Sequence, residues 1–92
     1  MAPQPAKPRV LIVGDTPANR YAFQSVLEEH YTVYIAGSGR RALELTRLEE
    51  FAVILLDVRM PEMDGFETAE HLRRDERIRF TPIIFTSAYD KT

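Results

Sequence analysis

Two acidic residues and two hydroxyl residues of this chain each follow a short apolar run, where they could take part in phosphate chemistry. They are Asp15, Asp57 and the neighbouring pair Thr86 and Ser87. Carboxylates suit hard divalent cations such as magnesium, which binds one or two of them and keeps several waters. A carboxylate held beside such an ion can attack phosphorus to form an acyl phosphate, whose oxygens a nearby hydroxyl can hydrogen-bond.

Alternating strand and helix patterns would bring these residues together. Apolar and β-branched runs predict strands at 10–13, 31–36, 51–56 and 82–87. Apolar residues at helical spacing predict three helices between them, with inner faces made of Phe23, Val26, Leu27, Ala42, Leu45, Leu48, Phe66, Ala69 and Leu72. Strict alternation with short connections indicates an α/β fold built on a parallel sheet with right-handed crossovers.

The strand ends decide where the chemistry would occur. The run 51–56 is apolar without interruption, so we expect a central strand that is covered on both faces. Parallel sheets carry their functional groups beyond the carboxyl ends of the strands, so Asp15 and Asp57 converge if the first and third strands are neighbours. Polar residues at the predicted helix starts would act as caps, namely Thr16 before Pro17, Ser38, and Asp64.

Size and composition set the class of protein. The chain has 92 residues, 45% of them hydrophobic and 28% charged, as expected for one small globular domain. A net charge of -2 gives no electrostatic case for binding nucleic acid or a membrane, and without cysteine there are no disulfides. Residues 1–8 contain three prolines and no apolar signal core, so we expect a disordered tail and a cytoplasmic protein.

One long segment resembles a known family. Residues 54–65 read Ile-Leu-Leu-Asp-Val-Arg-Met-Pro-Glu-Met-Asp-Gly, which is similar to the receiver domains of two-component signalling: an apolar strand, a phosphoaccepting Asp, two variable residues, then Met-Pro-x-Met-Asp-Gly. Residues 10–15 resemble the first strand of that family with its acidic end. Residues 82–88 resemble its fourth strand with a Ser or Thr before Ala.

The resemblance implies a flavodoxin-like doubly wound sheet and a role for each site residue. Asp57 would accept a phosphoryl group from a phosphohistidine of a sensor histidine kinase or a histidine phosphotransfer protein. Magnesium would be bound by Asp15, Asp57 and the backbone carbonyl of Arg59. Ser87 would be the switch hydroxyl, with Thr86 as the other candidate, and its movement would change the output of the domain.

The chain departs from the family pattern in two places. Gly14 stands where receivers usually have the first of two adjacent acids, which predicts weakened magnesium binding. The sequence also stops after the fourth strand, so residues 9–92 are expected to form a partial receiver domain. That domain would have four strands and three helices, and would lack the fifth strand, its lysine and the last two helices. An unprotected fourth strand predicts self-association. Either a fragment or a natural or processed truncation would account for this length.

Other interpretations remain open at this stage. Asp57 alone could be an ordinary turn residue, and the Arg59 side chain could contact a phosphoryl group or simply face solvent. A phosphatase of the haloacid dehalogenase type also uses an Asp at a strand end, but needs a second Asp where this chain has Arg59. A degenerate receiver that binds partners without phosphorylation is the third possibility. The sequence names neither the kinase nor the output.

Overall fold

The computed structural model describes residues 7–86, which alternate strands and helices as the sequence predicts. The elements in chain order are β1 (Arg9–Val13), α1 (Pro17–Leu27), β2 (Thr32–Ala36), α2 (Gly39–Leu48), β3 (Val53–Asp57), α3 (Gly65–Arg73), the short 3-10 helix η1 (Glu76–Ile78) and β4 (Ile83–Thr86). Residues 1–6 lie outside the described part, so the tail predicted for 1–8 and the domain boundary at residue 9 stay predictions.

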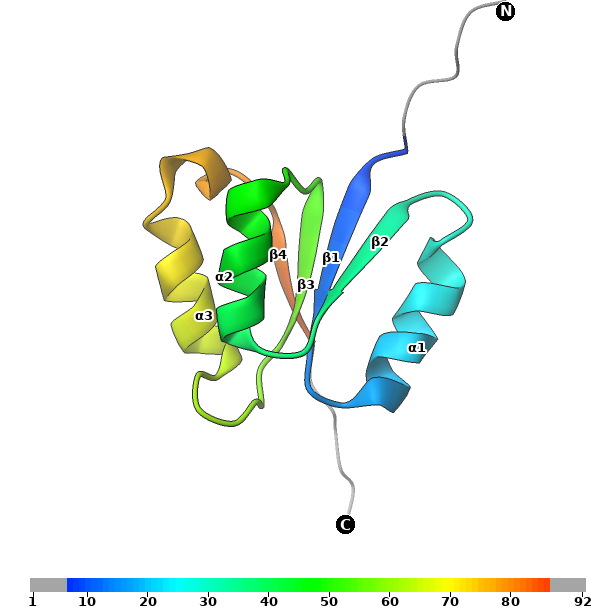
Figure 1. The fold of residues 1–92 in the computed structure, drawn as a ribbon, viewed down its shortest axis with the longest axis horizontal. Coiled ribbons are helices and arrows are strands. Elements are labelled where there is room, and N and C mark those ends of the chain that lie inside the picture. Colours follow the sequence, from blue (N-terminus) through cyan, green and yellow to red (C-terminus); the bar gives the residue numbers. More distant parts are fainter. Residues whose placement is uncertain (1–6, 87–92) are drawn as a thin grey trace, which may run out of the picture.

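The four strands form one parallel sheet in the order β2-β1-β3-β4. In β1 and β3, Val10 lies beside Val53 and Val13 beside Leu56, so the last residue of β3, Asp57, extends one position beyond the end of β1. Figure 1 shows all four strands running in the same direction, with the turns that follow β1, β2 and β3 gathered at one end. The predicted α/β class is therefore confirmed, and the condition for Asp15 and Asp57 to converge is met, because β1 and β3 are neighbours.

Helices cover both faces of the sheet, with α1 on one side and α2 and α3 on the other (Figure 1). The larger apolar cluster lies under α2 and α3 and contains Leu11, Val13, Ala36, Ala42, Leu45, Phe51, Ile54, Leu56, Met60, Leu72 and Ile78. The smaller cluster, Val10, Ile12 and Leu55, packs against Phe23 and Leu27 of α1. No helix among residues 7–86 is long and apolar enough to span a lipid bilayer.

Two of the three predicted helix caps are confirmed. The Ser38 hydroxyl accepts a hydrogen bond from the Arg41 N–H, and the Asp64 carboxylate accepts one from the Glu67 N–H. Each satisfies an N–H group that has no partner inside its helix. Thr16 is the N-cap residue of α1 and Pro17 follows it at the first helical position, as predicted, but the Thr16 side chain makes no capping hydrogen bond. Proline at the first helical position makes that cap less necessary, since it removes one N–H group and fixes φ.

Three residues predicted on inner helix faces are largely exposed: Val26 at 73%, Leu48 at 74% and Phe66 at 57%. Val26 and Leu48 lie in the last turns of α1 and α2, and Phe66 lies in the first turn of α3. Leu48 is the last residue of α2, and Phe66 in the first turn of α3 contacts Phe85 of the outermost strand β4. Helical spacing identifies residues on one face of a helix, but it does not show how far along the helix that face stays buried.

Candidate functional site

Asp57 ends the central strand β3 and is 4% exposed, a buried carboxylate at the edge where the turns gather. Its Oδ1 accepts a hydrogen bond of 3.2 Å from the Arg59 N–H. A side chain that accepts from the N–H two residues later turns the chain sharply, as Asp does in Asx turns. The bend fixes the Asp57 side chain and places Arg59 next to it, while the Arg59 side chain itself is exposed.

Gly14 lies directly beside the Asp57 carboxylate. A Cβ atom built on Gly14 would be 3.4 Å from both Cβ and Oδ2 of Asp57. The next residue is Asp15, which is exposed and belongs to the turn between β1 and α1. The structure thus brings the predicted acidic residues Asp15 and Asp57 to the same edge of the sheet, on adjacent strands.

Thr86 comes to the same edge from the other side. It is the register partner of Asp57 in the β3–β4 pair, and its carbonyl accepts a hydrogen bond from the Val58 N–H. Thr86 is half-buried. Ser87, the predicted switch hydroxyl, lies outside the described residues. Three adjacent strands, β1, β3 and β4, therefore contribute to one site that has Asp57 at its centre.

Gly65 closes the loop between β3 and α3 onto the site. Its N–H donates to the Val58 carbonyl at 2.9 Å, and a Cβ on Gly65 would overlap the Asp57 carbonyl. Glu62, within this loop, has a φ of 67°, a left-handed conformation that is uncommon for a non-glycine residue. The sequence predicted a turn and a cap here, but not that glycine is needed for close approach to the backbone of Asp57.

Arg20 is a contributor that the sequence did not single out. Its guanidinium Nη1 donates to the Gly14 carbonyl at 2.8 Å, and this contact is partly buried. The only signal for it in the sequence is an arginine five residues after Asp15. Arginine at that spacing occurs on many solvated helices, so the side chain's target could not have been predicted.

The oxygen donors at this edge fit a magnesium ion. Asp15 and Asp57 supply two carboxylates, and the backbone near Arg59 supplies carbonyl oxygens. Within residues 7–86 no three His, Cys, Asp or Glu side chains gather into a possible metal cluster. Magnesium, which uses one or two carboxylates and retains water, matches this set of donors.

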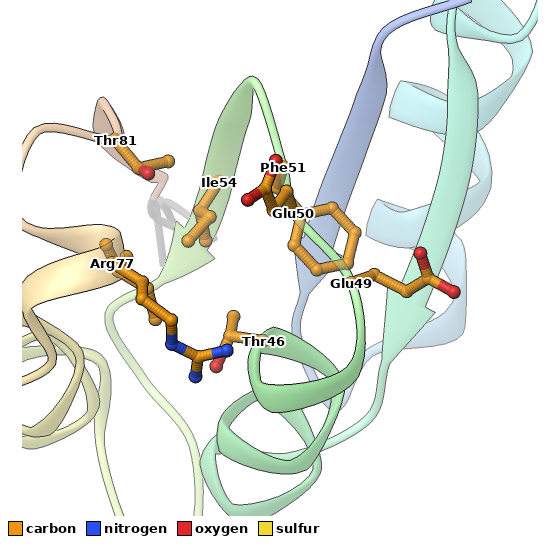
Figure 2. A pocket seen from close by; sticks show the side chains of 8 residues that line it. Thr46, Glu49, Glu50, Phe51, Ile54, Arg77 and Thr81 are labelled. Carbon is orange, nitrogen blue, oxygen red and sulfur yellow. The ribbon is translucent and has the colours of Figure 1, made fainter. Parts of the chain in front are cut away.

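A cavity of about 230 Å³ lies at the opposite end of the sheet from Asp57. Its lining includes Phe51, Ile54 and Ile78 and the polar residues Glu50 and Arg77. Figure 2 shows these side chains coming from the end of α2, the start of β3 and the segment around η1. The Arg77 guanidinium forms an ion pair with the Asp75 carboxylate. Hydrogen bonds from Arg77 hold the pKa of that carboxyl below its usual value. None of the predicted site residues lines this cavity.

Comparison with known proteins identifies the family. The family model described as the response regulator receiver domain matches residues 10–92. The chain belongs to this family. Receiver domains are in general signalling modules of two-component systems rather than enzymes, and they bind magnesium. The four-stranded parallel sheet and three α-helices formed by residues 7–86 match the fold of solved receiver domains.

Several receivers are similar in sequence and structure. Protein PilH of Pseudomonas aeruginosa is 33% identical over 84 residues, which are 90% of this chain and 69% of PilH. The chemotaxis protein CheY4 of Vibrio cholerae is 34% identical with a TM-score of 0.87, over 94% of this chain and 72% of that one. The receiver domain of a P. aeruginosa sensor histidine kinase is 30% identical with a TM-score of 0.82, covering 87% and 66%. That structure has a magnesium ion in its active site cleft.

Proposed function

We propose that this receiver domain accepts a phosphoryl group on Asp57 and passes the signal to another domain or protein. The observation that supports this most is the place of Asp57: a 4% exposed carboxylate at the carboxyl end of the central strand. It lies against Gly14 of the neighbouring turn and beside Thr86 in register. An ordinary solvent-facing turn residue needs none of these contacts. The site therefore favours the phosphoacceptor over the turn interpretation.

The chain's own residues would prepare Asp57 for attack. The Arg59 N–H holds Oδ1, which leaves Oδ2 on the side of Gly14 as the oxygen to form the new bond. That oxygen would attack the phosphorus of a phosphohistidine. The P–O bond forms as the P–N bond breaks, and the released imidazole takes a proton from solvent. A Cβ at position 14 would lie 3.4 Å from Oδ2, so glycine leaves this side of the carboxylate uncovered.

Asp15, Asp57 and the Arg59 carbonyl would hold a magnesium ion, as the resemblance implies. When bound, such an ion offsets negative charge on the transferred phosphoryl oxygens. The magnesium ion in the related P. aeruginosa receiver supports the assignment. Thr86, the register partner of Asp57, is one candidate for the switch hydroxyl. Ser87, the other candidate, lies outside the described residues.

The partner class follows from the chemistry. A donor carrying phosphohistidine, either a sensor histidine kinase or a histidine phosphotransfer protein, would meet the edge that carries Asp57. The proposal includes a cytoplasmic location, where such donors act. A phosphatase of the haloacid dehalogenase type remains poorly supported, because the position two residues after Asp57 is the exposed Arg59 rather than a second acid.

Labelling stoichiometry separates these possibilities. We expect one phosphate per chain after incubation with magnesium and acetyl phosphate, detected by intact mass, and none in Asp57→Asn. A phosphatase would instead turn over a generic phosphate ester continuously, and a degenerate receiver would show neither labelling nor turnover. A phosphorylated phosphotransfer domain in place of acetyl phosphate then tests whether phosphohistidine is the donor.

We also propose self-association through β4. The Ile54 N–H donates to the Pro82 carbonyl and the Val58 N–H to the Thr86 carbonyl. Strand alternation then turns the backbone groups of Ile83 and Phe85 toward the outer edge, where no described strand pairs with them. Antiparallel pairing of two copies about an axis at Ile84 would satisfy these four groups. The exposed side chains of Ile84 and Phe85 would be covered at the same time.

A substitution on β4 tests this arrangement. In the proposed dimer, residue 84 of one copy lies opposite residue 84 of the other. Ile84→Lys would therefore bring two positive charges together, and charged residues on an edge strand oppose strand pairing. Sedimentation velocity at micromolar concentration should show a dimer for the parent chain and a monomer for the variant. A parent chain that sediments as a monomer would contradict the proposal.

A further inference from the structure

The turn that carries Asp15 is held by its backbone at two points. The Gly14 N–H donates to the Ala36 carbonyl of β2 at 3.0 Å. The Gly14 carbonyl accepts from Nη1 of Arg20 at 2.8 Å. Glycine has no side chain with which to pack, so these two bonds are what the structure offers to fix its position. Gly14 in turn lies against Asp57 and precedes Asp15.

The Arg20 guanidinium also lies beside the next turn along the sheet edge. A Cβ on Gly37 would be 3.4 Å from Nη1, an ordinary contact distance. Gly37 lies between β2 and α2, so one half-buried side chain from α1 reaches the turns that follow both β1 and β2. A planar guanidinium with several fixed donors suits this position better than a flexible ammonium group.

We propose that Arg20 is a positioning residue of the phosphoacceptor site: by holding the Gly14 carbonyl it keeps Asp15 in place beside Asp57. The proposal rests on the proposed function, since it assigns Arg20 to the same magnesium site. Arg20 acts through the backbone of Gly14 and contacts no reacting atom. Its loss would leave Gly14 held only by the Ala36 carbonyl, and Asp15 would lose its fixed distance from Asp57.

The molecule contains a matched control at the other end of the sheet. Arg73 of α3 also uses Nη1 to bind backbone carbonyls, those of Ile78, Arg79 and Thr81. These lie near η1 and the start of β4, away from Asp57. If both guanidinium groups only stabilise the fold, removing Arg20 or Arg73 should lower stability and leave the metal site alike in the two variants. A positioning role predicts an effect on the metal site for Arg20 alone.

The first test is magnesium affinity, measured by titration calorimetry. Arg20→Met keeps the apolar stem and removes the donors, and it should weaken magnesium binding by about tenfold, the low end for residues that orient metal ligands. Arg20→Lys restores one donor and should recover part of the affinity. Arg73→Met should bind magnesium as the parent chain does, although it unfolds at lower urea concentration. Equal weakening in Arg20→Met and Arg73→Met, or none in either, would overturn the proposal.

The second test does not depend on the metal. Amide hydrogen exchange of Gly14, followed by NMR without magnesium, should be faster in Arg20→Met than in the parent chain and unchanged in Arg73→Met. If the parent chain binds no magnesium, the metal assignment fails, and this exchange result alone decides the positioning role. If Arg20→Met does not fold, Arg20→Lys should still show faster exchange at Gly14 than the parent chain. Unchanged exchange contradicts the proposal.

Discussion

At each end of the sheet an arginine side chain donates hydrogen bonds to backbone carbonyls, yet the two ends are packed differently. At the carboxyl end, Arg20 binds the Gly14 carbonyl, and at the opposite end Arg73 binds three carbonyls around η1. The carboxyl end is tight at Gly65, whose backbone lies directly against the Asp57 carbonyl. The opposite end contains a cavity of about 230 Å³. Close packing thus belongs to the end that must hold a buried carboxylate in one orientation.

The largest expected effect comes from overfilling the tight end. Gly65→Ala would drive a methyl group into the Asp57 carbonyl, where neither backbone can move freely. We expect a loss of about 3 kcal/mol in the free energy of unfolding, the upper end for overpacking, measured in urea. Gly37→Ala is the control, since its added methyl would meet only the Arg20 guanidinium at 3.4 Å. Equal stability of the two variants would contradict the difference in packing.

A smaller effect should follow from adding the missing acid. The space beside Asp57 Oδ2 accepts a side chain at position 14 at ordinary contact distance. Gly14→Asp should raise magnesium affinity roughly tenfold, or about 1.4 kcal/mol, because a further carboxylate joins the donors. Without metal, the same variant should be less stable than Gly14→Asn, since two carboxylates would repel each other. Equal magnesium affinities of Gly14→Asp and the parent chain would show that the glycine does not weaken the site.

Filling the cavity at the opposite end should have little effect. Thr81 is half-buried and lines that cavity, so Thr81→Ile adds apolar volume where space exists. We expect the free energy of unfolding to change by less than about 0.5 kcal/mol, the range of ordinary surface substitutions. A loss as large as that of Gly65→Ala would mean that both ends are equally tight.

The smallest effect is the pH dependence of stability that arises from Asp75, which lies near the cavity end of the sheet. The hydrogen bonds from Arg77 lower the pKa of Asp75 below its usual value. A carboxyl whose pKa is lower in the folded chain than in the unfolded chain stabilises the fold at pH values above the unfolded pKa. This stabilisation is lost as the pH falls through the folded pKa. Removing the group in Asp75→Asn should therefore destabilise the chain at about pH 6 and have less effect at about pH 3. The group is exposed, so salt should reduce the difference. Urea unfolding at both pH values measures it.

The alternation of strands and helices and the main residue of the site could be predicted because they depend on chain-local patterns, whereas the strand order followed from the family resemblance. The apolar run that ends at Asp57 indicates a central strand, and the carboxyl ends of parallel strands meet at one edge. The caps at Ser38 and Asp64 were predicted for the same reason, since a cap involves residues three positions apart.

The remaining features depend on contacts between distant segments. The contact of Arg20 with Gly14 and the approach of Gly65 to Asp57 arise only when α1, α3 and the sheet are packed together. The exposure of Leu48 and Phe66, at the end of α2 and the start of α3, depends on how each helix is placed on the sheet. No spacing in the sequence carries that information, because amphipathic patterns describe one helix at a time.

The most direct test of the account is to locate the phosphoryl group. The chain is incubated with magnesium and acetyl phosphate, any acyl phosphate is trapped by borohydride reduction, and the modified residue is found by tandem mass spectrometry. The account predicts a single modified residue, Asp57. Modification of Asp15 or Asp64 instead, or no trapped acyl phosphate in a folded, magnesium-bound chain, would contradict it.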